Sequence, residues 1–145
     1  MSFTNLLYNI NSSAHQALQK HGLTRAATAD DKVGFSFISF SCPDALIGIL
    51  SDFILSLQEV EIAIVSSVRN DGIKLSVRSE NKDVHAGELI REALQGVGDG
   101  GGHATMAGGL IKKDNVALLG TSPEIKIHEL FLNVLDKKDA AEGGA

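Results

Sequence analysis

Cysteine and tryptophan are almost absent from this chain of 145 residues, which contains one cysteine, Cys42, and no tryptophan. A single cysteine excludes an internal disulfide and a zinc site built from several cysteines. A lone thiol without a secretory signal is typical of a reducing compartment, so we expect a cytoplasmic protein. Aromatic residues make up only 5% of the chain, so the core must consist mainly of Ile, Val, Leu and Ala.

Long apolar runs and an excess of positive charge are also missing. The longest apolar stretches, such as ALIGIL at 45–50, are far shorter than the roughly 20 residues of a membrane-spanning helix, so we expect no membrane contact. The formal net charge is -5, whereas a protein that grips a long duplex normally presents a basic surface. The remaining composition, 43% hydrophobic and 21% charged, is typical of a globular domain.

The order of the expected elements indicates an α/β fold. Apolar residues at helical spacing predict helices over 5–21, 43–57, 85–96 and 125–135. Runs rich in β-branched residues predict strands over 33–40, 60–69 and 73–79, with a further strand and turn over 108–119. The intervening Asn-Asp-Gly at 70–72 is a strong hairpin signal and forces an antiparallel pair. We therefore predict a single domain with a mixed β-sheet of about five strands flanked by helices.

Three segments differ in composition. Residues 1–24 form an N-terminal helical segment, 25–138 form the folded domain, and 139–145 lack apolar anchors and are expected to be a disordered tail.

The stretch GVGDGGGHATMAGG, from Gly96 to Gly109, is dominated by glycine. It contains the spacing GxGxxG, but it follows a helix instead of a strand and lacks the expected downstream acid, so a dinucleotide site is not favoured. Consecutive glycines at 100–102 would instead let backbone N–H groups converge on an anion, with His103 adding a charged hydrogen bond to a phosphate. The alternative is a flexible connection with an incidental surface histidine.

The strand after the hairpin predicts a second element of the same site. Its alternation separates an apolar face from a basic face, formed respectively by Ile73, Leu75 and Val77 and by Lys74, Ser76 and Arg78. The strand ends in Arg78 and Ser79, and an arginine there can hold a phosphate through two hydrogen bonds. The alternative is an ordinary solvated sheet face. No catalytic residue and no metal-ligand set are predicted, because no nucleophile has a recognisable base and no carboxylates or histidines cluster.

A strand ending in VRS, followed after some twenty residues by GGGHATMAGG, resembles the DHH-associated C-terminal domain of DHH-family phosphoesterases, most firmly from Val60 to Ile111. That family includes RecJ-like exonucleases, nano-RNases that degrade very short RNA, and phosphatases acting on 3′-phosphoadenosine 5′-phosphate. Its N-terminal lobe holds two manganese ions through an Asp-His-His signature, and its C-terminal lobe binds the nucleotide. The resemblance implies that Gly100, Gly101, Gly102 and His103 contact phosphate or sugar, with Arg78 and the adjacent Ser79 clamping from the neighbouring strand.

Two departures from the family pattern stand out: Met106 replaces a more usual alanine, and the chain has no Asp-His-His. We therefore expect a nucleotide-binding lobe that is inactive alone, with the two manganese ions in a missing lobe that would be its partner. The Met1-Ser2 start and Gly-Gly-Ala end favour a fragment, with 1–24 as the interlobe connection. The expected ligand is a nucleotide or short single-stranded RNA or DNA, and a homodimer is left open. The alternative is a non-catalytic RNA-binding or dimerisation module, like the related domain at the end of alanyl-tRNA synthetases.

Overall fold

The computed structural model of the chain describes residues 33–39, 41, 43–56 and 60–143. The helix expected at 5–21, the segment 1–24 and Cys42 lie outside this part. The described elements follow in the order β1 (Val33–Ile38), α3 (Asp44–Ser56), β2 (Ile62–Arg69), β3 (Gly72–Ser79), α4 (Ala86–Ala93), β4 (Asp99–Gly102), β5 (Met106–Lys112), the 3₁₀ helix η2 (Lys113–Leu119) and α5 (Pro123–Gly143). The five strands form one sheet in the order β1-β2-β3-β5-β4.

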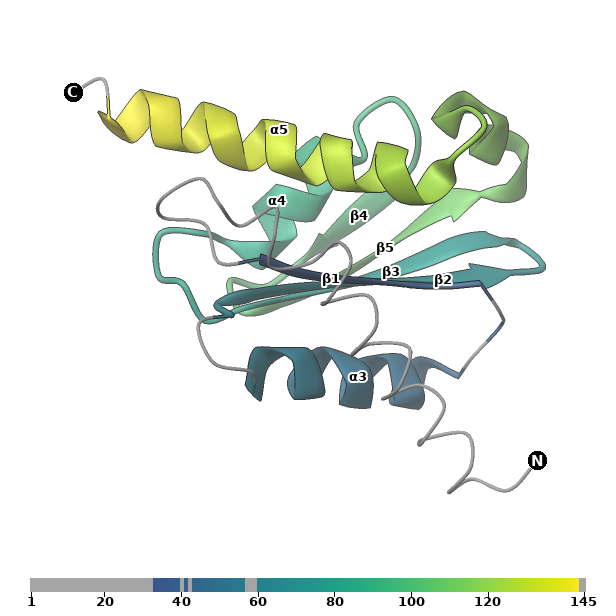
Figure 1. Cartoon of the computed structure of the whole chain (residues 1–145), viewed down its shortest axis with the longest axis horizontal. Coiled ribbons are helices and arrows are strands. Elements are labelled where there is room, and N and C mark those ends of the chain that lie inside the picture. Colours follow the sequence, from purple (N-terminus) through teal and green to yellow (C-terminus); the bar gives the residue numbers. More distant parts are fainter. Residues whose placement is uncertain (1–32, 40, 42, 57–59, 144–145) are drawn as a thin grey trace.

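The sheet is mixed, because β1 runs parallel to β2 while the other neighbouring pairs are antiparallel. The prediction of a single α/β domain with about five strands is thereby confirmed. Figure 1 shows α3 beneath one face of the sheet and α4 with α5 over the other. None of the helices within the described ranges is long and apolar enough to span a membrane.

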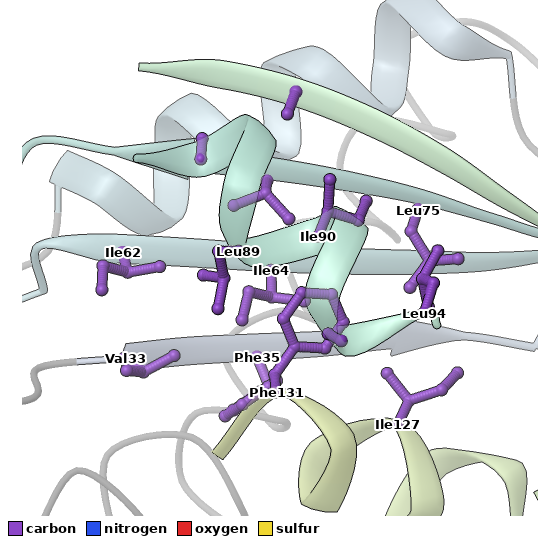
Figure 2. Close-up of a cluster of buried hydrophobic side chains, with 14 of the residues drawn as sticks. Val33, Phe35, Ile62, Ile64, Leu75, Leu89, Ile90, Leu94, Ile127 and Phe131 are labelled. Atoms are coloured by element: carbon purple, nitrogen blue, oxygen red, sulfur yellow. The ribbon is translucent and has the colours of Figure 1, made fainter. Parts of the chain in front are cut away.

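Two apolar clusters hold these layers together. The larger lies between the sheet, α4 and α5, where Phe35, Leu75 and Phe131 are at most 1% exposed. Figure 2 shows Leu89 and Ile90 of α4, together with Phe131 of α5, directed toward the strands. The smaller cluster lies between the sheet and α3, where Leu50 and Ile54 are fully buried. The sheet is therefore fixed from both faces, and strand residues of opposite parity meet different helices.

The hairpin between β2 and β3 forms where Asn-Asp-Gly predicted it, with Arg69 paired to Gly72. Gly72 has a φ of +139°, and a Cβ built there would lie 2.0 Å from the carbonyl oxygen of Ile111. Only glycine fits this position, since any side chain would collide with the backbone of β5.

Two regions differ from the sequence-based expectation. The last helix runs to Gly143, well past the expected end at residue 135 and into the segment where we expected a disordered tail. The glycine stretch is not a loop, because it supplies β4 and most of β5, joined by a tight turn. A four-residue strand with three consecutive glycines is not predicted from sequence, because glycine has a low strand propensity and pairing with β5 determines the conformation of β4.

Candidate ligand-binding site

The basic face of β3 borders a cavity of about 330 Å³ on the same side of the sheet as α3. Residues from four elements line it: Asp44, Ile47 and Gly48 of α3; Lys74, Leu75, Ser76 and Arg78 of β3; Gly101 and Gly102 of β4; Met106, Ala107 and Gly108 of β5. Three of the six predicted site residues, Arg78, Gly101 and Gly102, line this cavity, whereas Ser79, Gly100 and His103 do not. The predicted neighbourhood of Arg78 and the glycines is therefore a real hollow.

The glycines do not act as a convergent set of N–H donors, so that part of the prediction is wrong. The His103 N–H donates to the Met106 carbonyl at 2.8 Å, and the same antiparallel register pairs Gly101 with Gly108. In such a ladder, alternate residues direct their N–H and C=O groups toward the partner strand. The Gly101 N–H therefore faces β5, and the donors of Gly100 and Gly102 lie two residues apart along the outer edge.

The glycines contribute to the cavity by lacking side chains, not by presenting converging N–H donors. A Cβ on Gly101 would have nothing within 4 Å, and one on Gly108 would meet only the Leu75 carbonyl oxygen at 3.5 Å. These two residues face each other across β4 and β5 and both line the cavity. Its floor is therefore bare backbone, which a ligand can approach more closely than any surface of side chains.

Gly100 and Gly102 have structural duties instead. A Cβ on Gly100 would lie 3.0 Å from the Ile90 side chain, so its open side faces the core under α4. Gly102 has a φ of +153°, and a Cβ on Gly87 of α4 would lie 2.5 Å from the Gly102 carbonyl oxygen. The close approach of α4 to β4 therefore needs glycine at position 87, whereas a Cβ on Gly102 would lie 2.7 Å from the Met106 carbonyl oxygen of β5.

Arg78 is the best-positioned cation of the site. Its side chain is 18% exposed, and its Nη1 lies 3.4 Å from Oδ1 of Asp52 on α3. A Cβ on Gly48 would lie 3.1 Å from Arg78 Nη2, so the small residue in mid-helix makes room for the guanidinium. The buried Nε has no hydrogen-bond partner among the described residues. Arg78 is thus held in place while one of its donors is unused.

His103 is not among the residues that line the cavity and lies in the turn between β4 and β5. Its carbonyl accepts a hydrogen bond from the Gly87 N–H at 3.0 Å, so the backbone of the turn is tied to the start of α4. Across the sheet, His103 is opposite Met106, and Met106 pairs with Arg78. Two strand spacings separate the histidine and arginine backbones by about 10 Å, a gap that their side chains could close on one phosphodiester unit.

Ser79 is 3% exposed and does not line the cavity. It shares the parity of Ile73 and Val77, which pack under α4 on the other face. Its Oγ donates to the Val84 carbonyl at 2.8 Å and accepts from the Asn81 N–H at 3.3 Å. These contacts give Ser79 a role in fixing the turn that follows β3.

Sequence reasoning missed the contribution of α3 and of Lys74. Lys74 was recognised on the basic face, but only the structure brings it into the cavity with Arg78. Gly48 could have indicated this contact, because a glycine inside a helix costs about 1 kcal/mol relative to alanine. Such a glycine indicates that another group packs closely against the helix. Nothing local, however, indicated which strand residue α3 would cover.

The described residues contain no group of three His, Cys, Asp or Glu side chains arranged to hold a metal ion. The manganese ions implied by the resemblance thus find no ligand set in this part of the chain. The α4 N-terminus is also unavailable to an anion, because His85 Nδ1 accepts from the Glu88 N–H and backbone carbonyls accept from Ala86 and Gly87.

Comparison with known proteins defines the family of this domain. Residues 30–121 match the DHHA1 domain, so the chain belongs to the DHHA1 family. No curated protein sequence matches the chain. An exopolyphosphatase-related protein from Bacteroides fragilis has a TM-score of 0.60 at 17% identity over 94% of this chain. RecJ from Thermus thermophilus, solved with Mn²⁺, has a TM-score of 0.59 at 16% identity over 92% of this chain.

These matches cover only part of each relative. The alignment takes in 35% of the Bacteroides protein and 17% of RecJ, so the described domain corresponds to a minor portion of either. The C-Ala domain of Aquifex aeolicus alanyl-tRNA synthetase also matches, with a TM-score of 0.49, 24% identity and coverage of 59% of this chain and 81% of that domain. At these identities the likeness concerns the fold.

Proposed function

We propose that this domain is the nucleotide-binding lobe of a DHH-family manganese phosphoesterase and binds a nucleotide or short single-stranded RNA in the cavity beside Arg78. The metal-bearing lobe would be its partner, acting with it in the cytoplasm. The observation that supports the proposal is the meeting of two cations, Lys74 and Arg78, with the bare backbone of Gly101 and Gly108 in one cavity. Backbone that a ligand can approach, beside a partly buried arginine, suits a phosphorylated sugar.

Each group has a distinct role in this proposal. Arg78 would supply charged hydrogen bonds to a phosphate. Lys74 would add a second positive charge two side-chain repeats along β3, about 13 Å away. The floor would receive the sugar, and His103 would contact a phosphate from the turn between β4 and β5. These residues bind and orient the ligand, and hydrolysis would require metal ligands from the partner lobe.

The test is an amide NMR titration of the 145-residue chain, without metal, using 5′-AMP and then a dinucleotide or tetranucleotide RNA. We expect saturable shifts at Arg78 and across 100–103. The variants Arg78→Gln and His103→Ala should each weaken binding by about 1–3 kcal/mol, the scale of a lost charged hydrogen bond. Arg91→Gln is the matched control, because Arg91 is exposed on α4 over the opposite face.

The outcomes separate the two readings of the domain. Localised shifts that need a higher ligand concentration in Arg78→Gln would support a ligand site, and added Mn²⁺ should then give no hydrolysis by this chain alone. Equal affinity of the parent and Arg78→Gln for RNA would remove Arg78 from the site. Binding in that case would favour a general RNA-binding module over a nucleotide lobe.

A further inference from the structure

A second cavity, of about 440 Å³, lies at the hairpin end of the sheet. It shares no lining residue with the cavity beside Arg78. Its β3 residues include Ile73, whose side chain points to the opposite face from Lys74 and Arg78. The two cavities are therefore separate sites on different faces of the same strand.

The walls of this second cavity are mostly apolar. Phe37 of β1, Val68 of β2 and Val116 of η2 are each half-buried, and the fully buried Ile73 contributes from β3. Ala117 of η2 and Pro123 of α5 complete the apolar lining. Small-molecule sites are typically cavities of roughly 300–1,000 Å³ with apolar walls and a few polar groups, and this space fits that range.

The backbone around the cavity is fixed in advance. Gly72 lines it and can carry no side chain that would fill it, because its φ is +139° and the Ile111 carbonyl stands in the way. The Lys113 N–H donates to the Asp71 carbonyl at 2.9 Å, which ties the start of η2 to the hairpin turn. The opening therefore follows from the fold and does not depend on a movable loop.

The charge at the cavity has one sign. Arg69 and Lys113 both line it, and no acidic residue does, although the whole chain carries a formal charge of -5. Arg69 is in an ion pair with Asp44 of α3. Lys113 is exposed and makes no ion pair with a described residue. The available charge for a ligand is thus a single ammonium group beside an apolar chamber.

We propose that this cavity binds a small carboxylate with an apolar body, of the kind represented by a phenylalkanoate or a medium-chain fatty acid. The body would pack against Phe37, Val68 and Val116, and the carboxylate would lie at Lys113. Five separate elements surround the space, which suits a compact ligand better than an extended peptide. This site is independent of the nucleotide-binding role of the first cavity.

The experiment is an amide NMR titration of the 145-residue chain with 4-phenylbutyrate and its neutral amide, 4-phenylbutanamide. We expect saturable shifts at 68–73 and 113–117 and none at 100–103. The acid should bind about 1.4- to fivefold more tightly than the amide, the range for one exposed charge pair. Absence of saturable shifts at millimolar ligand, or equal affinity for acid and amide, would overturn the proposal.

Variants test each half of the ligand separately. Lys113→Ala should erase the difference between acid and amide while the amide still binds. Lys112→Ala is its matched control, because Lys112 is equally exposed but does not line the cavity. Ala117→Phe, at an exposed position of η2, should fill the chamber and abolish binding of both ligands, with thermal unfolding verifying that the fold is kept. A preference for the acid that persists in Lys113→Ala would refute the assignment. Shifts produced only by acidic apolar peptides would also refute it and would indicate a binding site for a partner protein.

Discussion

Asp52 competes with any anionic ligand for Arg78, so removing its charge should tighten binding. Its Oδ1 is 3.4 Å from Arg78 Nη1, and the Asp52 side chain is 68% exposed while that of Arg78 is 18% exposed. A phosphate entering the cavity must draw the guanidinium away from this carboxylate or share it. Asp52→Asn leaves the shape of the side chain nearly unchanged and removes the competing charge.

The magnitude follows from the geometry of this pair. Two unit charges 3.4 Å apart attract by about 1.2 kcal/mol at the dielectric constant of water. Measured exposed ion pairs contribute less, about 0.2–1 kcal/mol, because water and ions screen them. Because 1.4 kcal/mol corresponds to tenfold in affinity, Asp52→Asn should lower the Kd for 5′-AMP by about 1.4- to fivefold. The gain should shrink as salt is raised from about 0.05 M to 0.5 M.

Calorimetry on four proteins tests this reasoning: the parent, Asp52→Asn, Arg78→Gln and the double variant. If Asp52 acts through Arg78, the gain from Asp52→Asn disappears in the Arg78→Gln background. Asp136→Asn is a control for general charge effects, since Asp136 is exposed on α5 over the other face of the sheet. Weaker binding by Asp52→Asn would refute competition and show that the carboxylate orients Arg78 for the ligand.

Three further predictions separate the roles of neighbouring residues. Gly101→Ala should leave thermal unfolding unchanged, because its Cβ meets nothing within 4 Å, and should weaken nucleotide binding measured by calorimetry. Gly109→Ala should do the reverse, since its Cβ would lie 2.9 Å from side-chain atoms of Ile90 and Leu94, and overpacking of this kind costs about 1–3 kcal/mol in chemical denaturation. Ser79→Ala should destabilise by about 1–3 kcal/mol through its lost buried hydrogen bonds while the Kd stays constant. A Kd that rises with Ser79→Ala would return this residue to the site.

The parts of the fold that local sequence determines could be predicted. The alternation in β3 and the Asn-Asp-Gly turn act within a few residues, and both the strand faces and the hairpin follow from them. β4 could not be predicted in this way, because its three glycines have no local preference for a strand. Pairing with β5 and packing of Ile90 over Gly100 determine its shape, and both contacts are made only after folding.

The candidate site could likewise be predicted only where local sequence determines it. Arg78 was predicted from the alternation of polar and apolar residues in β3, and the glycines were predicted from the unusual composition of 96–109. The distinction among the glycines, and the roles of Gly48 and Ser79, depend on which element packs on which face. Ser79 shows the limit most clearly: it is adjacent to Arg78 in sequence, yet alternation sends it to the opposite face of the sheet, where it is 3% exposed.

The consecutive glycines beside the candidate site are therefore there for different structural reasons. Gly102 is needed because a Cβ there would lie 2.7 Å from the Met106 carbonyl oxygen of β5, and Gly100 because Ile90 occupies the space. Among the three glycines at 100–102, Gly101 alone has open space where a Cβ would be, and it faces Gly108, whose Cβ would meet only the Leu75 carbonyl oxygen at 3.5 Å. Packing explains the first two glycines without any ligand, whereas it leaves Gly101 unexplained. No packing contact with a described residue requires glycine at position 101. If the domain binds a nucleotide, close approach of that ligand is the reason for a glycine there.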